Sequence, residues 1–346
     1  MLKPICMRKV INQTKKKIIL AGLGSVGKFY LRSLIKYNYN FIVFDPHIKK
    51  KNFYFNKYKD LARELNHNEY THAIICSQAD THFYNFNFFL KYGVKNFLIE
   101  KPMGNNLLNL YNIKKKELDS NLRIISNYKW SVVKLNDQIK KIEKKFKMGE
   151  MYNFISYAGA CCLATGGVHI IDFLNNYFLF KKNKFNLYAK LNLKKINPRN
   201  KKLYNIGGFI NFNKDNLSAT IHYDNNSRIA PVNIMIYKNH KIEFNLYGDY
   251  KIYEIKKNIW NEKITRYDYP SLIKKGSFYQ NNIIDNITKL FVEKNYSIND
   301  IDRGISCFEL MLAALISHKK KSSLKLNNIN NLIKKNKMFD RNIPIT

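Results

Sequence analysis

The sequence of 346 residues predicts an α/β fold built in two parts. In the first part, short apolar strands alternate with helical segments, which is the pattern of a parallel sheet with crossover connections. From about residue 150 the pattern changes to long strands of alternating polarity, which is typical of a mostly antiparallel sheet. We therefore expect an N-terminal domain at residues 1–127 and a C-terminal α/β domain with a large open sheet at residues 128–346.

Apolar runs give the expected elements of both parts. The first sheet should have strands at 17–21, 41–45, 72–76, 96–99 and 122–126, with helices between them that include 26–37, 81–92 and 105–117. The second sheet should have strands at 152–160, 185–193, 204–212, 218–223, 232–237, 241–247 and 251–256. Two helices near 277–293 and 299–318 should follow, and the chain should end in a polar tail.

The composition predicts a globular protein of the cytoplasm. The chain is 45% hydrophobic and 14% aromatic, and it is long enough for two domains with their own cores. No apolar run approaches the roughly 20 residues of a membrane span, and the N-terminus lacks the apolar segment of a signal peptide. The five cysteines are odd in number and show no C-x-x-C spacing, so we expect neither disulfides nor a metal site. They are Cys6, Cys76, Cys161, Cys162 and Cys307.

The net charge of +35 is interpreted as a solvated surface. The excess is almost entirely lysine, whereas a phosphate-binding face would recruit arginine, whose fork grips phosphate with two hydrogen bonds. The lysine runs at 15–17, 114–116 and 319–321 lie at the ends of different elements. We therefore expect no specific nucleic-acid partner and no membrane partner, although the charge can assist encounter with anionic substrates.

The stretch from Lys17 to Gly27 carries the strongest functional signal, because an apolar strand runs into a complete G-x-G-x-x-G and then a helix. Gly22 permits the tight turn, Gly24 lets the backbone approach a pyrophosphate, and Gly27 allows close helix packing. The phosphates would lie at the helix N-terminus. A glycine turn without function is the alternative. The candidate cofactor-binding residues here are Gly22, Gly24, Ser25, Val26 and Gly27.

Asp45 ends the next strand, about twenty residues after the glycines, where a dinucleotide site needs an acid. Its carboxylate can accept both ribose hydroxyls and repels a 2′-phosphate, which favours NAD over NADP. A strand-terminating turn at Asp45 and Pro46 is the alternative. NADP stays possible, because His47 and the lysines at 49–51 follow directly and can hold a 2′-phosphate.

Two later strands also end in polar residues. The strand before Cys76 opens into a helix that begins near His82, which places Cys76, Ser77, Gln78 and His82 at the edge where cofactors lie. A plain helix cap at Asp80 or Thr81 is the alternative here.

The strand 97–99 ends in Glu100 and Lys101. A charged pair at the edge of a buried strand is costly unless it has a role, so we expect Lys101 beside the nicotinamide and Glu100 near the cofactor.

At this point the chain resembles the Gfo/Idh/MocA oxidoreductases, the glucose-fructose oxidoreductase and inositol dehydrogenase group. Glu100-Lys101-Pro102 carries the resemblance, together with the segment 127–130 and the helix 306–317. The resemblance implies a Rossmann domain joined to an open-sheeted α/β domain whose sheet often forms the oligomer interface, hence a homodimer or homotetramer. It also implies that Lys101 contacts nicotinamide and substrate and assists proton transfer, with Lys129 near the substrate.

The segment 163–172 is similar to the glycine turn and helix that carry the catalytic histidine of this family. His169 and Asp172 are one helical turn apart, so the carboxylate can orient the imidazole or hold a substrate hydroxyl. A structural histidine is the alternative. Many members have an Asp four residues before this histidine, whereas this chain has Thr165, which cannot take a proton at neutral pH. Thr165, His169 and Asp172 are expected to contact the substrate.

Three functions follow from these residues. The preferred one is an NAD(P)-dependent oxidoreductase acting on a hydroxyl or ketone carbon of a sugar, sugar nucleotide or polyol, with Lys101 or His169 handling the proton. The second is a cofactor-binding regulatory protein of the same fold. A nucleic-acid-binding module is third and rests on charge alone.

Overall fold

The computed structural model describes residues 16–49, 53–159, 162–193, 196–197, 200–224, 226–255, 269–279, 282–293 and 301–343. The chain divides into two compact units. Unit 1 comprises Met1–Met103, Ile113–Asn127 and Ile284–Ile301, and unit 2 comprises Gly104–Asn112, Tyr128–Ile283 and Asp302–Thr346. Several predicted features lie outside the described residues: the strand ends at 160 and 256, the helix start at 299, Cys6, Cys161, Lys15, Lys50 and Lys51.

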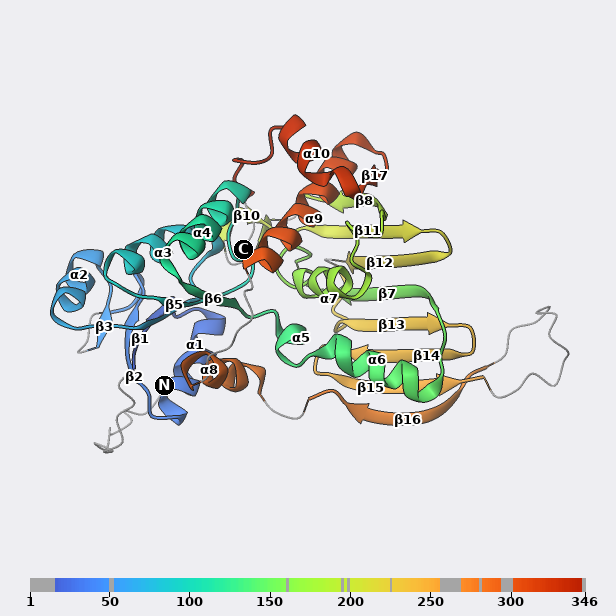
Figure 1. Cartoon of the computed structure of the whole chain (residues 1–346), viewed down its shortest axis with the longest axis horizontal. Helices are drawn as coiled ribbons and strands as arrows, with labels where there is room; N and C mark the ends of the chain where they lie inside the picture. Colours follow the sequence, from blue (N-terminus) through green and yellow to red (C-terminus); the bar gives the residue numbers. More distant parts are fainter. Residues whose placement is uncertain are drawn as a thin grey trace, which may run out of the picture. The chain divides into compact units, whose positions relative to one another are not determined.

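Unit 1 contains a six-stranded sheet in the order β3-β2-β1-β4-β5-β6 (Figure 1), and every neighbouring pair is parallel. This confirms the predicted parallel sheet. The central strands are apolar on both faces, which requires cover on both sides. The two-residue strand β3 was not predicted. The strands are β1 (Lys17–Ala21), β2 (Asn40–Phe44), β3 (Tyr54–Phe55), β4 (His72–Ile75), β5 (Asn96–Ile99) and β6 (Arg123–Ser126).

Helices connect these strands, as the alternating pattern predicted. Leu61 and Leu65 are one helical turn apart and buried, and they give the helix between β3 and β4 its apolar face. The helix that follows β5 begins in unit 2 and ends in unit 1. The connecting elements are α1 (Ser25–Lys36), α2 (Tyr58–His67), the short 3₁₀ helix η1 (Ala79–Thr81), α3 (His82–Lys91) and α4 (Leu107–Ser120).

A helix from the late part of the chain, α8 (Ile283–Glu293), belongs almost entirely to unit 1. Its Phe291 is fully buried, with its ring 5.1 Å from that of His72 on β4. Asp285 pairs with Lys36 of α1 at 2.6 Å, and Arg123 of β6 donates to the Leu290 carbonyl at 3.0 Å. Helix α8 therefore covers part of the parallel sheet, although strands of unit 2 precede it in the sequence.

Unit 2 is built on a nine-stranded sheet in the order β16-β15-β14-β13-β7-β12-β11-β8-β17. Its pairs are antiparallel except β7 with β12, which confirms the mostly antiparallel sheet. A separate two-stranded sheet pairs β9 (Ile196–Asn197) with β10 (Asn200–Tyr204). The large sheet consists of β7 (Met151–Gly159), β8 (Asn186–Asn192), β11 (Gly207–Lys214), β12 (Leu217–Asp224), β13 (Val232–Tyr237), β14 (His240–Asn245), β15 (Asp249–Glu254), β16 (Ser271–Ser277) and β17 (Leu324–Lys325).

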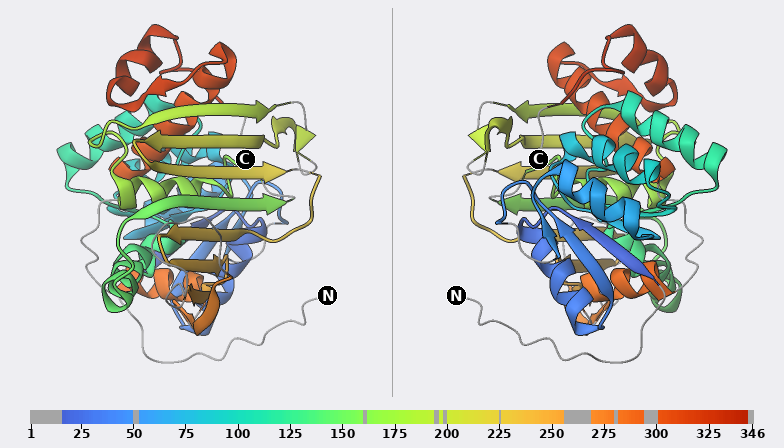
Figure 2. Two further views of the ribbon diagram at one scale, coloured as in Figure 1. Left: turned by 90° about the vertical axis from the view of Figure 1, so that its right-hand side faces the viewer. Right: turned by 90° about the vertical axis from the view of Figure 1, so that its left-hand side faces the viewer.

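One face of this sheet is covered by helices and carries the core of unit 2. Phe173 of the covering helix α7 lies 5.8 Å from Phe154 of β7 and 6.0 Å from Phe244 of β14, measured between ring centroids. The other face is seen directly in the left view of Figure 2, and no helix of the described chain covers it. The helices of unit 2 include α5 (Lys129–Val132), α6 (Leu135–Phe146), α7 (Val168–Phe178) and α9 (Ile301–Lys320).

Two predictions for the end of the chain were wrong. The helix expected from 277 begins at Ile283, because Ser271–Ser277 form backbone hydrogen bonds with β15 as an edge strand. The polar tail contains the 3₁₀ helix η2 (Leu326–Asn328) and α10 (Ile329–Lys335). Leu326, Ile329 and Ile333 recur at helical spacing and are at most 2% exposed. This lysine- and asparagine-rich segment therefore has one apolar face, which is buried against the rest of the protein. Within the described chain, no helix combines the length and apolarity that crossing a membrane requires.

The packing of α8 against β4 predicts a pH dependence of stability. Burial, with a contribution from the Lys16 and Arg123 charges, lowers the pKa of His72 to about 4. An unfolded histidine titrates near pH ~6.5, so the unfolded chain binds the proton first and stability falls as the pH drops from about 6.5 towards 4. Between pH ~7 and ~4.5, wild-type protein should lose about 2 kcal/mol more unfolding free energy than His72→Gln, as measured by urea denaturation.

The exposed His67 at the end of α2 provides the matched control. His67→Gln should follow the wild-type dependence on pH. Equal pH dependence for wild type and His72→Gln would contradict the neutral, buried state of His72.

Candidate functional site

The glycine loop connects β1 to α1 at the carboxyl edge of the parallel sheet. Gly22 has φ of +97°, and a Cβ on it would lie 2.5 Å from the Ser77 nitrogen. A Cβ on Gly27 would lie 2.1 Å from the Gly22 carbonyl oxygen. These two positions therefore need glycine for the turn and for close packing, as the sequence indicated. A Cβ on Gly24 would meet no atom within 4 Å, so Gly24 faces open space.

Helix α1 begins at Ser25 with Gly24 at its N-cap, and no side chain caps it. The first-turn N–H groups of a helix have no intrahelical acceptor, and the positive end of the helix dipole adds to their attraction for anions. The first turn also contains no acidic residue. The loop and helix end therefore fit a phosphate group, and the open space over Gly24 leaves room for one.

Asp45 lies directly after β2 and is tied to the glycine loop by hydrogen bonds. Its Oδ2 accepts the Leu23 N–H at 2.6 Å, and its Oδ1 accepts the His47 N–H at 2.8 Å. The carboxylate is thus fixed beside the loop while each oxygen keeps a further lone pair for a ligand hydroxyl. This is the position that the sequence assigned to the ribose-binding acid.

Some of the predicted residues after β4 pack inside the protein, and others are exposed to solvent. The Cys76 thiol donates to the Gly22 carbonyl at 3.1 Å, and burial raises its pKa, so it is a neutral packing group under the loop. The Ser77 hydroxyl accepts from Thr81 and Asn85 at 2.7 and 3.0 Å. Burial also lowers the pKa of His82, which is 1% exposed. Gln78 is the exposed member of the predicted set.

Glu100 is a buried carboxylate held by three donors at the end of β5. Its Oε1 accepts the Tyr30 hydroxyl at 2.7 Å and the Asn127 amide at 2.9 Å. Its Oε2 accepts the backbone N–H of Lys101 at 3.2 Å. Helix α1, strand β5 and the end of β6 are therefore joined at one charge. Lys101 itself is partly exposed at this edge.

Tyr30 is a site residue that sequence reasoning missed. It lies three residues after Gly27 on the buried face of α1 and is fully buried. Burial and the neighbouring Glu100 charge both raise the pKa of its hydroxyl, so it stays protonated and donates to the carboxylate. The signal in the sequence was a polar hydroxyl at an apolar helix position, which needs a buried partner.

In unit 2, a glycine turn leads into α7 and His169. The Gly166 N–H donates to the Cys162 carbonyl at 2.7 Å, and a Cβ on Gly167 would lie 2.4 Å from the Leu163 carbonyl oxygen. His169 lies in the first turn of α7 and is 8% exposed, whereas Thr165 in the turn is partly exposed. The predicted turn and helix are therefore present.

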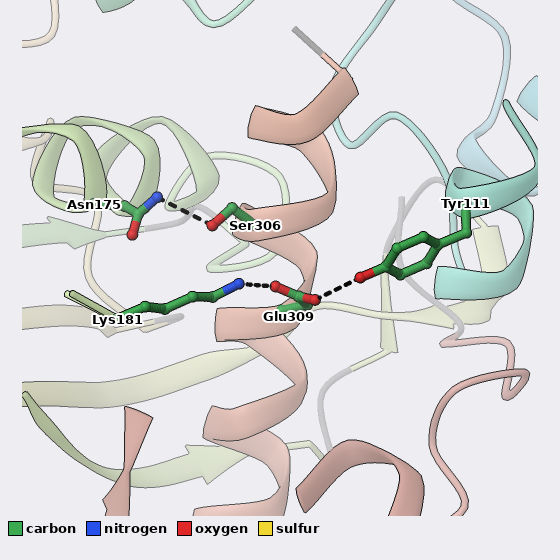
Figure 3. A network of polar contacts seen from close by, with 5 residues as sticks. All are labelled: Tyr111, Asn175, Lys181, Ser306 and Glu309. Atoms are coloured by element: carbon green, nitrogen blue, oxygen red, sulfur yellow. Dashed lines mark hydrogen bonds and ion pairs between the residues drawn. The ribbon is translucent and has the colours of Figure 1, made fainter. Parts of the chain in front are cut away.

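Asp172 is 2% exposed and belongs to a row of polar contacts between α7 and α9. Its Oδ1 accepts from Arg303 at 3.1 Å and from Asn176 at 2.8 Å. One turn further along both helices, Asn175 donates to the Ser306 hydroxyl at 3.2 Å (Figure 3). These contacts fix the rotation of α7, and with it the position of His169.

The same row continues beyond the end of α7. Figure 3 shows Lys181 pairing with Glu309, which also accepts the Tyr111 hydroxyl at 3.1 Å. Glu309 is 1% exposed, so its charge is stabilised by a cation and a hydroxyl in the interior. Tyr111 stays protonated, because burial first and Glu309 second raise its pKa to about 12.

Lys129, expected near the substrate, makes local contacts in unit 2. Its ammonium donates to the Leu246 carbonyl at 3.1 Å and lies 5.3 Å from the Trp130 ring centroid. This arrangement holds α5 against the end of β14. Among the described residues, no group of three or more His, Cys, Asp or Glu side chains is arranged to hold a metal ion.

No family model matches the sequence, and no curated protein is significantly similar to it. Solved structures share its fold. An oxidoreductase from Agrobacterium radiobacter in complex with NAD+, L-tartaric acid and magnesium matches with a TM-score of 0.67 and 10% identity over 91% of this chain and 100% of that chain. UDP-N-acetylglucosamine 3-dehydrogenase GnnA from Acidithiobacillus ferrooxidans matches with a TM-score of 0.63 and 12% identity over 87% and 96% of the two chains.

The super-repressor mutant of Gal80p from Saccharomyces cerevisiae has the same fold, with a TM-score of 0.65 and 12% identity over 91% of this chain and 98% of that chain. At these identities the likeness shows the fold alone. The fold implied by the resemblance to the Gfo/Idh/MocA group is therefore confirmed.

The Glu100 cluster predicts a specific loss of stability. Tyr30→Phe removes one donor from a buried carboxylate and changes little else, and a hydrogen bond to a charged group contributes about 1.5–3 kcal/mol. Urea denaturation should show a loss of unfolding free energy in that range. Tyr84→Phe on α3, where the side chain is 55% exposed, is the matched control and should be neutral within ~0.5 kcal/mol. Equal losses of unfolding free energy in Tyr30→Phe and Tyr84→Phe would contradict a stabilising hydrogen bond from Tyr30 to Glu100.

Proposed function

We propose that this chain is an NAD(P)-dependent oxidoreductase of the Gfo/Idh/MocA type. One observation carries the proposal: the open space over Gly24 lies at the uncapped N-terminus of α1, with the Asp45 carboxylate fixed to the same loop. A dinucleotide needs this combination, because its pyrophosphate requires N–H donors and its ribose requires an acceptor. The fold shared with an oxidoreductase in complex with NAD+ supports it.

In this proposal the residues of unit 1 bind and orient the cofactor. The N–H groups at Ser25, Val26 and Gly27 would hold the pyrophosphate, and Asp45 would accept the ribose hydroxyls. Ser77 and Gln78 stay candidates for the same surface. Cys76 and the buried His82, whose ring nitrogen lies 3.0 Å from the Ser77 carbonyl oxygen, would support the loop from beneath. When bound, the nicotinamide supplies the site that accepts or donates a hydride. Asp45 favours NAD, and NADP stays possible because His47 follows it.

Lys101 and His169 are our candidates for the proton that accompanies the hydride. Lys101 follows the Glu100 cluster, whose three hydrogen bonds fix the backbone from which the lysine projects. His169 lies on a helix whose rotation is fixed by Asp172, and we assign Asp172 to this positioning role ahead of direct substrate contact. Thr165 and Lys129 stay candidates for substrate hydroxyls.

We infer that the substrate carries a hydroxyl or ketone carbon of a sugar, sugar nucleotide or polyol. The resemblance supports this class, as does the shared fold of a UDP-N-acetylglucosamine dehydrogenase. The net charge of +35 would assist encounter with an anionic sugar nucleotide. A screen of sugar nucleotides, free sugars and polyols that follows nicotinamide absorbance tests the proposal.

A regulatory protein that binds the cofactor without turnover is the second candidate, because the Gal80p repressor shares this fold. Thr165 in place of the family's usual acid also favours it. Cofactor binding without turnover on any substrate in the screen would support this second function.

We also propose that the chain forms a homodimer or homotetramer through the open face of the nine-stranded sheet. Partly exposed apolar side chains lie on that face, among them Ile155 and its neighbour Ile234 across the β7–β13 pair. Contiguous apolar surface of this kind is typical of protein interfaces.

Cofactor binding gives the first functional prediction. Because a Cβ on Gly24 meets no protein atom, Gly24→Val should leave the fold intact while its side chain fills the space for the pyrophosphate. Calorimetric titration with NAD should show at least a tenfold loss of affinity, about 1.4 kcal/mol or more. Gly24→Ala should give a smaller loss, and the melting temperature without cofactor should not change. Unchanged affinity in Gly24→Val would show that the loop is assigned wrongly.

Lys101→Met tests proton transfer. Removing an acid–base partner should lower turnover by about 100-fold or more while NAD affinity and stability stay near wild type. Lys95→Met, at an exposed position just before β5, is the matched control and should keep full activity. If Lys101→Met turned over at the wild-type rate on the true substrate, the lysine would have no catalytic role.

The oligomer prediction is tested by Ile234→Lys. A charge on the open face should oppose association, so sedimentation should show smaller species than wild type at equal concentration. Tyr247→Lys, at a 71% exposed position in the β14–β15 turn, should leave the assembly unchanged. A wild-type chain that sediments as a monomer would contradict the proposed interface.

A further inference from the structure

A cavity of about 450 Å³ opens at one end of unit 2. It is formed by α6, the start of β7, the end of α7 and the turn between β11 and β12. None of the residues assigned above to cofactor or substrate lines it. His169 is in the first turn of α7, whereas the cavity is lined by Tyr177 in the last turn, about 12 Å further along the helix at 1.5 Å per residue.

Aromatic side chains form much of the cavity lining. They are Tyr152 of β7, Tyr177 and Phe178 of α7, and Phe185 in the segment before β8. The faces of such rings carry partial negative charge and attract cations. The Lys140 ammonium lies 5.9 Å from the Tyr177 ring centroid, which shows that this ring attracts a positive charge.

The charge of the lining is opposite to that of the chain. Basic residues outnumber acidic ones 60 to 25 in the whole sequence. The cavity is lined by one cation, Lys214, and by three carboxylates, Glu143, Glu150 and Asp215, of which Asp215 pairs with Lys214 at 3.9 Å. The lining therefore favours a positively charged ligand.

Glu143 is held in place by two tyrosines. Its Oε1 accepts the Tyr237 hydroxyl at 2.5 Å and the Tyr177 hydroxyl. Burial is the main cause that raises the pKa of both tyrosines, so they stay protonated as donors. Within the described chain these hydrogen bonds engage only one oxygen of Glu143, which leaves Oε2 as an acceptor for a ligand.

The end of α7 adds to the negative potential. The C-terminus of a helix carries partial negative charge, which basic side chains in the last turn commonly offset. Helices α1, α6 and α9 have lysines in their last turns, whereas α7, like α4 and α8, has no basic residue there. The last two residues of α7, Tyr177 and Phe178, line the cavity.

We propose that this cavity binds a small organic cation with an apolar stem and a guanidinium or ammonium head. The aromatic side chains take the stem, and the Glu143 carboxylate takes the head. A chain of net charge +35 repels cations in general, so cation binding has to arise from a local site. The proposal is independent of the oxidoreductase function.

The test is calorimetric titration of the full-length protein with butylguanidinium at physiological salt. Wild type should bind it saturably, and Glu143→Gln should weaken binding at least about fivefold, because the charge partner is lost while a hydrogen-bond acceptor stays. Tyr177→Leu should weaken it through loss of the ring. Glu254→Gln, which removes a carboxylate of unit 2 that does not line the cavity, should bind as wild type.

A second compound, N-acetyl-arginine amide, shows whether the natural ligand is an arginine side chain of a peptide or a free small molecule. If it is a peptide side chain, N-acetyl-arginine amide should bind more tightly than butylguanidinium. If it is a free small molecule, butylguanidinium should bind more tightly. Glu150→Gln replaces Glu143→Gln if circular dichroism shows that the latter does not fold. The proposal would be overturned if wild type did not bind butylguanidinium saturably. It would also be overturned if Glu143→Gln, or Glu150→Gln in its place, bound butylguanidinium as tightly as Glu254→Gln does.

Discussion

The close approach of three backbones at the glycine loop is the constraint on which unit 1 depends. Strand β1, helix α1 and the end of β4 meet so closely that neither Gly22 nor Gly27 can carry a side chain, because a Cβ on Gly22 would overlap the Ser77 nitrogen and a Cβ on Gly27 would overlap the Gly22 carbonyl. The Cys76 thiol fills the remaining space under the loop. Gly24 is different, since nothing in the protein requires it to lack a side chain. The space over Gly24 is therefore available to a ligand. Gly22 and Gly27 are needed for the fold, whereas Gly24 fits a role in binding.

A second buried centre fixes the edge that carries Lys101. The Glu100 charge would be costly inside the protein without compensation. Tyr30 and Asn127 supply hydrogen bonds from two other elements, and the backbone of Lys101 supplies the third. The electrostatic requirement of one carboxylate thus determines how α1, β5 and the segment after β6 meet. A lysine next to such a fixed point projects from a backbone that cannot shift freely.

Unit 2 uses α7 in two ways. Near its start, the ion pair of Asp172 with Arg303 and the contact of Asn175 with Ser306 fix the rotation of the helix that carries His169. At its end, Tyr177 and Phe178 contribute to the acidic, aromatic cavity. One helix therefore carries both the candidate proton-transfer residue and two residues of the proposed cation site, and the rise of the helix sets their separation. A ligand in the cavity would contact the same rigid element that positions His169.

The sequence by itself determined both sheets and most of their strands, because the period of apolar residues reports which faces are buried. It did not predict β3, β16 or α10. It also determined the glycine loop, Asp45 and the turn before His169, since those residue types are needed for local backbone geometry. It did not predict that α8 joins unit 1 or that residues 326–335 bury an apolar face, because both depend on contacts between residues far apart in the chain. The partners of Glu100 and Asp172 were likewise decided by tertiary structure: Tyr30 and Arg303 lie 70 and 131 positions away. The local helix and strand preferences of a sequence carry no information about pairs so far apart in the chain. Only the packing of the folded protein brings a buried carboxylate next to the donors that compensate its charge.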